Sequence, residues 1–506
     1  MTARARWSDR ARLALIFGGL GVLAATGQAP LGWWWASLAA LSALFAILSL
    51  DATIRATSGR MWLAGTGYFG AALFWIVEPF FIEPEIHGWM APFALVLMAG
   101  GMALFWGLAG GLSAWLARGR GRLVVLGGLI VALEMLRGWI FTGFPWAMLG
   151  HGLIGTPLMQ AAAYLGAGGL SLIMVLAALL PVLGRGWAMR GAGTAGALAA
   201  LAGLWVWGSS QTSLPAAREN VVRLAQPNAP QSEKWLEENR FLFFNRLLDQ
   251  TETPAEIAPE LVLWPETSVP FLLEYAGEGL EMIAEAAAQH GPDTLVGFGV
   301  QRIEDGRYFN SLAVLTTQAE VTHIYDKHHL VPFGEYIPFS EWLMGTPVGG
   351  LAGRALLGYS PGPGPALLDL GPLGVALPLI CYESIFPRHL RTETRPDWVL
   401  QVTNDAWFGE LTGPFQHLAQ ARLRAVEQGL PVLRVANTGV SAFIDARGGV
   451  VAELGLGETG FVDSPIPGAL PPTLYARLGD WPVLGLLAIL LGGAVAASRM
   501  RPGPRG

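Results

Sequence analysis

The chain carries apolar segments long enough to cross a lipid bilayer, and this feature constrains its fold more than any other. About 20 consecutive apolar residues span a bilayer as a helix, and by that measure the sequence predicts eight spans. Hydrophobic residues make up 52% of the chain, charged residues only 14%, and the mean hydropathy is +0.44. The predicted spans are residues 12–28, 32–50, 61–80, 90–116, 123–141, 157–183, 190–208 and 481–498.

The distribution of charge predicts how these spans are oriented. Residues 211–480 carry 17 Lys and Arg against 32 Asp and Glu, whereas the rest carries 15 Arg against 6 acids. If the spans alternate in direction, the arginine clusters all fall on one side, which the positive-inside rule makes cytoplasmic. We therefore expect both termini in the cytoplasm and a soluble body outside it. No basic patch with interleaved aromatic residues is present on that body, which excludes a nucleic-acid-binding protein.

The same pattern divides the chain into three parts. We expect a seven-helix transmembrane domain at 1–208, a soluble catalytic domain at 209–478, and a final helix with a cytoplasmic tail at 479–506. One span contains Glu134 and Arg137, which form either a functional pair or a self-neutralising pair near the outer interface.

The soluble part alternates short β-rich runs with helical stretches. This alternation predicts an α/β fold with a mixed sheet flanked by helices. Helices are expected near 231–250, 274–290, 384–391 and 414–428. Strands are expected at 221–225, 261–263, 294–299, 311–315, 375–380, 399–402, 432–434 and 441–444.

Cys381 is the one cysteine in the chain. A free cysteine is often a small buried hydrophobe, but Cys381 closes an apolar run and polar Tyr382 and Glu383 follow at once. A strand end that opens into a turn presents a nucleophile rigidly. A single unpaired thiol on the oxidising side of a membrane is also unusual unless the thiol is needed.

Two other short polar stretches, like the one that follows Cys381, lie within apolar sequence. They are Leu263-Trp-Pro-Glu266 and Ile324-Tyr-Asp-Lys327. A thiol needs a base in reach, and Glu266 lies against apolar residues that make a carboxylate a stronger base. Lys327 would stabilise the thiolate or an oxyanion, aided by the backbone N–H of Tyr382. His328 and His329 are a lesser alternative base. Each of the two stretches, the one ending at Glu266 and the one ending at Lys327, also fits an ordinary turn when it is taken alone.

Lysine is rare in this chain, since only Lys234 and Lys327 stand among 32 basic residues. Lysine is a compact point charge whose pKa shifts readily, whereas arginine is always charged. We interpret Lys327 as functional and Lys234 as an exposed remnant of compositional bias.

The three polar stretches that contain Glu266, Lys327 and Cys381 together resemble the Glu-Lys-Cys triad of the nitrilase superfamily. The arrangement of seven predicted spans, a soluble domain and a final span is similar to that of the bacterial apolipoprotein N-acyltransferase family. The resemblance covers essentially the whole chain. It implies a nitrilase-like αββα sandwich inserted before the last helix of an eight-helix transmembrane bundle. The matching stretches are Gln226-Pro-Asn-Ala-Pro-Gln231, Tyr308-Phe-Asn-Ser311, Lys327-His-His-Leu-Val-Pro-Phe-Gly-Glu335-Tyr336, Asn404-Asp-Ala-Trp-Phe-Gly409, Gly413-Pro-Phe-Gln-His417 and Arg137-Gly-Trp-Ile-Phe-Thr-Gly-Phe-Pro-Trp146.

The resemblance also implies residue roles. Glu266 would be the general base, Lys327 the electrostatic stabiliser and Cys381 the nucleophile. Glu335 would hold Lys327, and Tyr382 and Glu383 would flank the nucleophile. Residues expected to bind or gate the substrate are Trp235, Trp407, Phe408, Asn310 and Tyr336. Phe415 stands where the family pattern has Trp.

The implied reaction is a ping-pong acyl transfer. A phospholipid, expected to be phosphatidylethanolamine, would acylate Cys381 and leave as a lysophospholipid. The α-amine of an S-diacylglyceryl-cysteine at a lipoprotein N-terminus would then take the acyl chain. The resemblance implies a monomer in the bacterial inner membrane with a periplasmic catalytic domain, without cofactor, metal or nucleic acid.

The apolar stretch at 338–357 has two interpretations: it forms either a membrane-facing lid or an ordinary buried helix and loop. Its apolar residues are Phe339, Trp342, Leu343, Met344, Leu351, Leu356 and Leu357. Two rival functions share parts of the sequence evidence. A membrane-tethered amidase would keep the triad but need a polar pocket, and a transporter or scaffold would need more ionisable residues within its spans.

Overall fold

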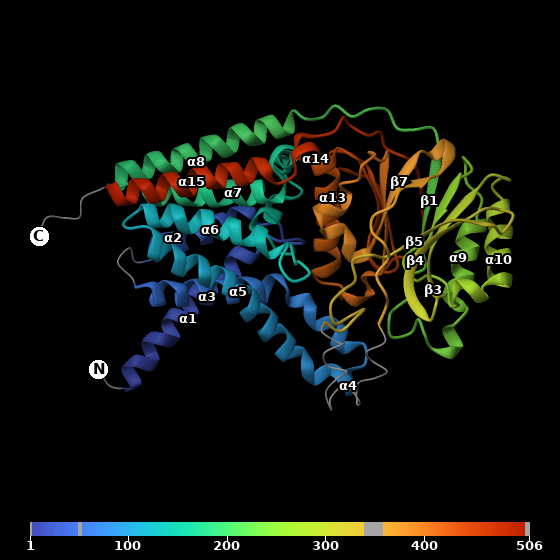
Figure 1. Cartoon of the computed structure of the whole chain (residues 1–506), viewed down its shortest axis with the longest axis horizontal. Coiled ribbons are helices and arrows are strands. Elements are labelled where there is room, and N and C mark those ends of the chain that lie inside the picture. The colour runs from blue at the N-terminus through green and yellow to red at the C-terminus, as the bar shows by residue number, and fades with distance from the viewer. Residues whose placement is uncertain (1–2, 49–52, 339–357, 501–506) are drawn as a thin grey trace, which may run out of the picture. The chain divides into compact units, whose positions relative to one another are not determined.

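The computed structural model describes residues 3–48, 53–338 and 358–500, which form two compact units (Figure 1). The helical unit contains residues up to 213 together with 411–427 and the segment from 472 onwards. The sheet unit contains residues 214–410 and 428–471. Residues 339–357 of the predicted lid lie outside the described residues.

Long helices make up the helical unit. Helix α3 packs along both α1 and α5, α6 lies against α5, α7 and α15, and α7 also packs on α8. The bounds of the long helices are α1 Ala3–Ala25, α2 Trp34–Ile47, α3 Ile54–Ala72, α5 Ala91–Leu116, α6 Gly121–Arg137, α7 Ala162–Leu183, α8 Gly186–Ser209, α13 Gly413–Gln428 and α15 Trp481–Met500. Shorter helices are α4 Pro84–His87 and α14 Leu474–Leu478.

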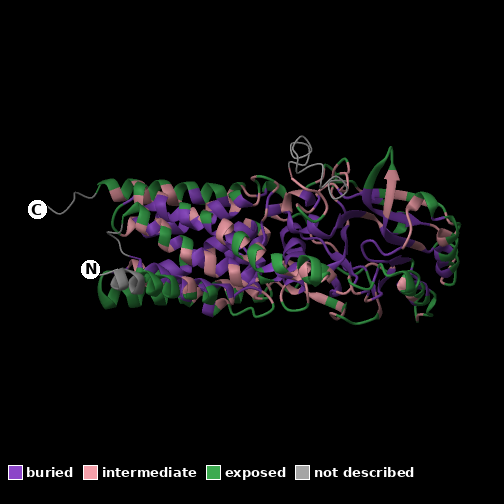
Figure 2. Cartoon of the chain, turned by 90° about the horizontal axis from the view of Figure 1, so that it is seen from below, coloured by how far each residue is buried: buried purple, intermediate pink, exposed green. Residues whose placement is uncertain are grey.

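Four helical segments among the described residues are long and apolar enough to cross a membrane. They are Pro84–Leu116, Pro157–Leu183, Gly186–Ser209 and Trp481–Met500, and Trp34–Ile47 is a shorter apolar helix. Large apolar residues such as Leu97, Val206 and Ile489 are exposed on these segments. Figure 2 shows exposed stretches along the helices in green. Exposed apolar side chains on helices of this length are expected where a helix faces lipid. The other predicted spans overlap helices α1, α3 and α6 and remain predictions.

Two charged residues buried in the helical unit, Glu134 and Arg137, are hydrogen-bonded. Glu134 accepts the N–H of Leu149 at 3.2 Å and the hydroxyl of Ser171 at 2.9 Å. Arg137 donates to the carbonyl oxygens of Phe144 and Trp146 at 2.8 and 2.7 Å. These bonds fix the polypeptide that follows α6, so a structural role is sufficient to explain both charges.

Helix α13 was expected within the soluble domain, but its contacts place it in the helical unit. Gln416 on this helix accepts a hydrogen bond from Trp146 at 2.6 Å and donates to the carbonyl oxygen of Ala72 at 3.0 Å. Glu427 accepts the N–H of Ala167 at 2.9 Å, where α7 is broken by Gly166.

The sheet unit contains two six-stranded sheets. The first has the order β12-β1-β2-β3-β4-β5, with β1, β2 and β3 parallel. The second has the order β11-β10-β9-β8-β7-β6, with β7, β8 and β9 parallel. The strands are β1 Val221–Gln226, β2 Leu261–Leu263, β3 Leu295–Glu304, β4 Arg307–Leu315, β5 Val321–Asp326, β6 Leu368–Asp369, β7 Val375–Ile380, β8 Trp398–Thr403, β9 Val432–Ala436, β10 Ser441–Ile444, β11 Val450–Leu454 and β12 Gly460–Pro465.

Two hydrophobic cores define the layers of this unit. One core joins the two sheets and includes Leu224, Ile380 and Leu400, all fully buried. The other lies between the first sheet and helices α9 Leu242–Glu252 and α10 Gly277–Ala288, and includes Trp264 and Phe298. Side chains alternate between the two faces of each strand, so neighbouring residues of β2 reach both cores.

The predicted strands are all present, some with longer bounds, but several other elements were missed or misread. Residues 231–241 are turns and a short 3₁₀ helix rather than the start of a helix, and α9 begins only at Leu242. The predicted helix at 384–391 is two short 3₁₀ turns, because Pro387 cannot continue the hydrogen bonding of a helix. Strands β5, β6, β11 and β12 were not predicted.

Arg223 offers a test of how the first sheet is held together. Its guanidinium is fully buried on β1 and makes two hydrogen bonds of 2.8 Å to Asp463 on β12. Arg223→Met leaves that carboxylate without its partner and should cost about 3 kcal/mol of folding free energy, or roughly 6–12 °C in the thermal midpoint. The measurement is thermal unfolding of the full chain in detergent.

The matched control is Arg307→Met on the exposed start of β4, which should leave the midpoint nearly unchanged. The double variant Arg223→Met with Asp463→Leu should recover most of the loss, because no unpaired carboxylate remains. Equal losses in the single and double variants would contradict the role of the ion pair.

Candidate active site

Cys381 lies where strand β7 ends and a 3₁₀ turn, Cys381–Ile385, begins. Its φ angle is +50°, in the left-handed region that residues other than glycine seldom adopt. The side chain is 5% exposed. Such a strained backbone is kept only where the surrounding structure enforces it, and here it turns the sulfur out of the strand at the end of a sheet.

Glu383 is the residue that enforces this turn. Its carboxylate is fully buried and accepts the N–H of Ile380 at 2.8 Å, just before the nucleophile. It also accepts the N–H groups of His328 and His329 at 2.8 and 3.1 Å, and the hydroxyl of Tyr325 at 2.9 Å. Burial would raise the pKa of Glu383, but His328 and these bonds hold it below its usual value. One carboxylate thereby connects the cysteine turn to the segment that follows Lys327.

Glu266 follows β2 in a turn that packs closely on β3. Gly299 permits this contact, because a Cβ atom there would lie 2.4 Å from the nitrogen of Thr267. Asn310 on β4 donates a 2.7 Å hydrogen bond to one oxygen of Glu266, and the backbone N–H of Asn404 donates a 2.9 Å bond to the other. The carboxylate is therefore held from both sheets.

Lys327 immediately follows β5 and is 1% exposed. Its Nζ lies 2.8 Å from Glu335 Oε1 and 3.4 Å from Glu266 Oε1. Burial alone would lower the pKa of Lys327, but the negative charges of Glu335 and Glu266 raise it well above its usual value. The ammonium therefore stays charged at neutral pH.

Asn310 also donates to Glu335 Oε1 at 3.1 Å, and the other oxygen of Glu335 accepts the N–H of Val331 at 2.8 Å. Glu335 thus has a fixed position from which it orients the Lys327 ammonium. Two carboxylates, one ammonium and one amide form a single hydrogen-bonded cluster.

The Cys381 thiol is electrostatically coupled to this cluster. Burial raises the pKa of the thiol, and the negative charge of Glu266 adds to the increase. The Lys327 ammonium and a hydrogen bond with the side chain of Thr403 act in the opposite direction. The resting cysteine is therefore a neutral thiol, and it needs a base at the moment it attacks a substrate.

The other predicted residues are buried to different extents. The ring of Tyr382 packs against Phe386 at a centroid distance of 5.0 Å. Phe408 packs against the core between the sheets, and Tyr336 is half-buried. Trp235 and Trp407 are 49% and 41% exposed, and their predicted role in gating the substrate stays a prediction.

Two residues near the site were not singled out from sequence. Asn404 holds Glu266 through its backbone, so its amino-acid type gives no signal of this contact. Lys234 was interpreted as exposed, and this was wrong: it is only 8% exposed. Among the described residues no cluster of three or more His, Cys, Asp or Glu side chains is arranged to hold a metal ion.

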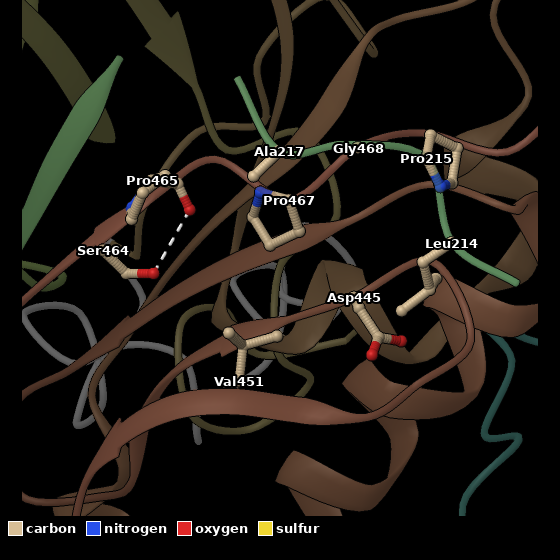
Figure 3. A pocket seen from close by; sticks show the side chains of 9 residues that line it. All are labelled: Leu214, Pro215, Ala217, Asp445, Val451, Ser464, Pro465, Pro467 and Gly468. Carbon is tan, nitrogen blue, oxygen red and sulfur yellow. Dashed lines mark hydrogen bonds between the residues drawn. The ribbon is translucent and has the colours of Figure 1, made fainter. Parts of the chain in front are cut away.

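A separate pocket of about 270 Å³ lies beside strand β12 (Figure 3). It is lined mainly by apolar residues and prolines such as Leu214, Pro467 and Val451, and by Asp445 and Ser464. None of the candidate site residues lines it, and its polar groups do not form a catalytic arrangement.

Comparison with known proteins gives consistent matches over both units. The carbon-nitrogen hydrolase family matches residues 221–470, and the N-terminal domain of apolipoprotein N-acyltransferase matches residues 20–180. An apolipoprotein N-acyltransferase from Caulobacter vibrioides is 38% identical, covering 98% of this chain and 96% of that protein. One from Rhizobium rhizogenes is 36% identical over 95% of each chain. A solved amidase of the nitrilase superfamily from Nesterenkonia is 17% identical, covers 54% of this chain and 98% of its own, and has a TM-score of 0.38.

The protonation state of Cys381 can be tested directly, because alkylation of the one thiol gives an unambiguous mass. Iodoacetamide reacts with the thiolate, so its rate with the wild type should keep rising from pH 7 to pH 10. Glu266→Gln removes a negative charge that raises the pKa of the thiol, and should therefore speed alkylation several-fold at pH 8. Intact-mass kinetics measure both rates.

The control is Glu274→Gln, a substitution at a carboxylate outside the Glu266–Lys327–Glu335 cluster, which should leave the rate unchanged. A wild-type rate that levels off below pH 8 would mean that the resting nucleophile is already a thiolate.

Proposed function

The chain belongs to the apolipoprotein N-acyltransferase family, and from this premise we propose that it transfers acyl chains through a thioester on Cys381. The observation that carries the proposal is the buried cluster in which Glu266 and Lys327 both act electrostatically on the thiol. A base, a cation and a nucleophile in one desolvated site are the groups that acyl transfer requires.

In the first half-reaction, the sulfur of Cys381 attacks the sn-1 ester carbonyl of a phospholipid. Glu266 takes the thiol proton as the S–C bond forms, and Lys327 stabilises the negative charge that develops on the carbonyl oxygen, with the N–H of Tyr382 as a second donor. The ester C–O bond then breaks, and Glu266 returns the proton to the leaving lysophospholipid. The product is an acyl thioester on the enzyme.

In the second half-reaction, the α-amine of the S-diacylglyceryl-cysteine attacks the thioester. Glu266 takes a proton from the amine, the C–N bond forms and the C–S bond breaks. The proton then passes to the sulfur and restores the resting thiol. The same base and the same oxyanion donors serve both steps, as a ping-pong reaction requires.

The remaining charged and polar residues act by positioning. Glu335 and Asn310 hold Lys327 and Glu266 in place, and Glu383 fixes the turn that carries the nucleophile. The half-exposed Trp235 and Trp407, with Phe408 and Tyr336, would line the way in for a substrate with long acyl chains.

The proposed setting is the bacterial inner membrane. In this arrangement all eight predicted spans cross the bilayer, both termini are cytoplasmic and the sheet unit is periplasmic. The donor is proposed to be phosphatidylethanolamine, the acceptors are diacylglyceryl lipoproteins, and the enzyme acts as a monomer. Both substrates are held in a membrane, so a membrane-anchored catalyst meets them without extracting them into water.

The test is the intact mass of the full chain in detergent after incubation with phosphatidylethanolamine. The wild type should gain the mass of one fatty acyl chain, which hydroxylamine should remove because it cleaves thioesters. Cys381→Ala should gain nothing. Lys327→Met should slow acylation at least about 100-fold, since it removes the main oxyanion donor.

An acyl adduct that persists in Cys381→Ala would place the nucleophile elsewhere. If no adduct forms but short amides are hydrolysed, the membrane-tethered amidase becomes the better reading. If no adduct forms and neither substrate reacts, an inert outer domain is indicated.

A further inference from the structure

Lys234 is a buried cation that the proposed mechanism does not use. It lies in the turn after Pro230, where its N–H bonds to the carbonyl oxygen of that proline at 2.9 Å. The residue is 8% exposed, and its ammonium lies 5.4 Å from the ring centre of Trp235. Within the part of the chain that the structure describes, this ammonium makes no hydrogen bond or ion pair.

The turn that carries Lys234 is fastened to the candidate active site. Gln231 accepts a 2.9 Å hydrogen bond from the Asn404 side chain, and the backbone N–H of Asn404 donates to Glu266. Asn437 donates to both Ala229 and Asn404. The turn that carries Lys234 is therefore tied to the carboxylate of Glu266 through Gln231 and Asn404.

The electrostatics agree with this placement. Burial lowers the pKa of Lys234 to about 8, and the negative charge of Glu266 is what opposes the decrease. Glu266 is also the carboxylate that acts on Cys381. Lys234 and the nucleophile are thus electrostatic neighbours of one group.

A lysine ammonium carries three N–H donors, and those of Lys234 meet no acceptor among the described residues, so they are available to a bound anion. Arginine supplies 30 of the 32 basic residues of the chain, so a lysine at this position differs from the composition of the rest of the chain. Lysine binds phosphate as a compact point charge. An anion with several oxygens is therefore the kind of ligand that suits this side chain.

We propose that Lys234 binds the phosphodiester of the phospholipid donor while its ester carbonyl lies at Cys381. The inference rests on the proposed function, in which the donor carries a phosphodiester on the same glycerol as the reacting ester. The diacylglyceryl-cysteine acceptor has no phosphate. Lys234 consequently distinguishes the donor from the acceptor, and it acts in the first half-reaction.

The experiment compares two donors with identical acyl chains, dipalmitoyl phosphatidylethanolamine and dipalmitoylglycerol. The readout is the ratio of their Cys381 acylation rates, followed by intact mass in detergent. In Lys234→Met this ratio should fall about 10- to 100-fold, the effect of losing a hydrogen bond between charged groups. Lys234→Arg keeps the charge and should retain most of the ratio.

The matched control is Arg240→Met, an exposed cation on the same segment, which should change the ratio less than about two-fold. Dipalmitoyl phosphatidylglycerol should suffer the same loss as phosphatidylethanolamine in Lys234→Met, because the phosphodiester is the group that both contain and dipalmitoylglycerol lacks. A loss confined to phosphatidylethanolamine would assign recognition to its amine and overturn the inference.

Two other outcomes also overturn it. An unchanged ratio would mean that Lys234 does not contact the phosphate. Equal slowing of both donors, with an unchanged thermal midpoint, would mean that Lys234 acts through Glu266 on the chemistry. A wild type that forms no adduct from any phospholipid would instead refute the proposed function and this inference with it.

Discussion

One buried ammonium holds the candidate site together. Lys327 lies between Glu266 and Glu335, and without it the two buried carboxylates would be bridged by the Asn310 side chain alone, with no positive charge between them. Two like charges close together repel each other strongly in a site of low polarity. The ammonium offsets this repulsion, and in the proposed reaction it also supplies the positive charge that an oxyanion needs. One ammonium therefore serves both the charge balance of the resting site and the proposed stabilisation of the oxyanion.

The fold meets this requirement by assembling the cluster from strand ends of both sheets. Glu266 follows β2 and Lys327 follows β5 in the first sheet, whereas Cys381 follows β7 in the second. A core of fully buried side chains joins the sheets, so the distances between these residues are fixed by packing rather than by loop conformation. Glu383 adds a polar connection between the sheets, because its carboxylate accepts the backbone N–H of His328, after β5, and that of Ile380, at the end of β7.

Sequence patterns predicted what depends on short stretches of chain. The run at 375–380 has the composition of a fully buried strand, and the polar residues after it mark a turn, so β7 and its cysteine were found together. Strand β5 was missed because its first four residues, Val321–Ile324, are half-buried or exposed and include a threonine and a histidine, so the stretch lacks the apolar run of a buried strand. The stretch at 231–241 has a helix-like composition, but its turn is held by Asn404 and Asn437, which lie far away in the sequence. Lys234 was misjudged for the same reason, since the neighbours that bury it are not local.

The protonated state of Cys381 has a consequence for the compartment in which the site is proposed to operate. Oxidants attack thiolates much faster than thiols, and the proposed periplasmic side is oxidising. Burial and the charge of Glu266 keep the resting sulfur neutral, so the nucleophile is protected while no substrate is present. In the proposed reaction, the proton leaves only when a carbonyl is in place and the Lys327 ammonium can stabilise the charge that develops on its oxygen. A site with a permanently ionised thiol would gain reactivity at rest and lose this protection, which explains why a base beside a neutral thiol is the better arrangement here.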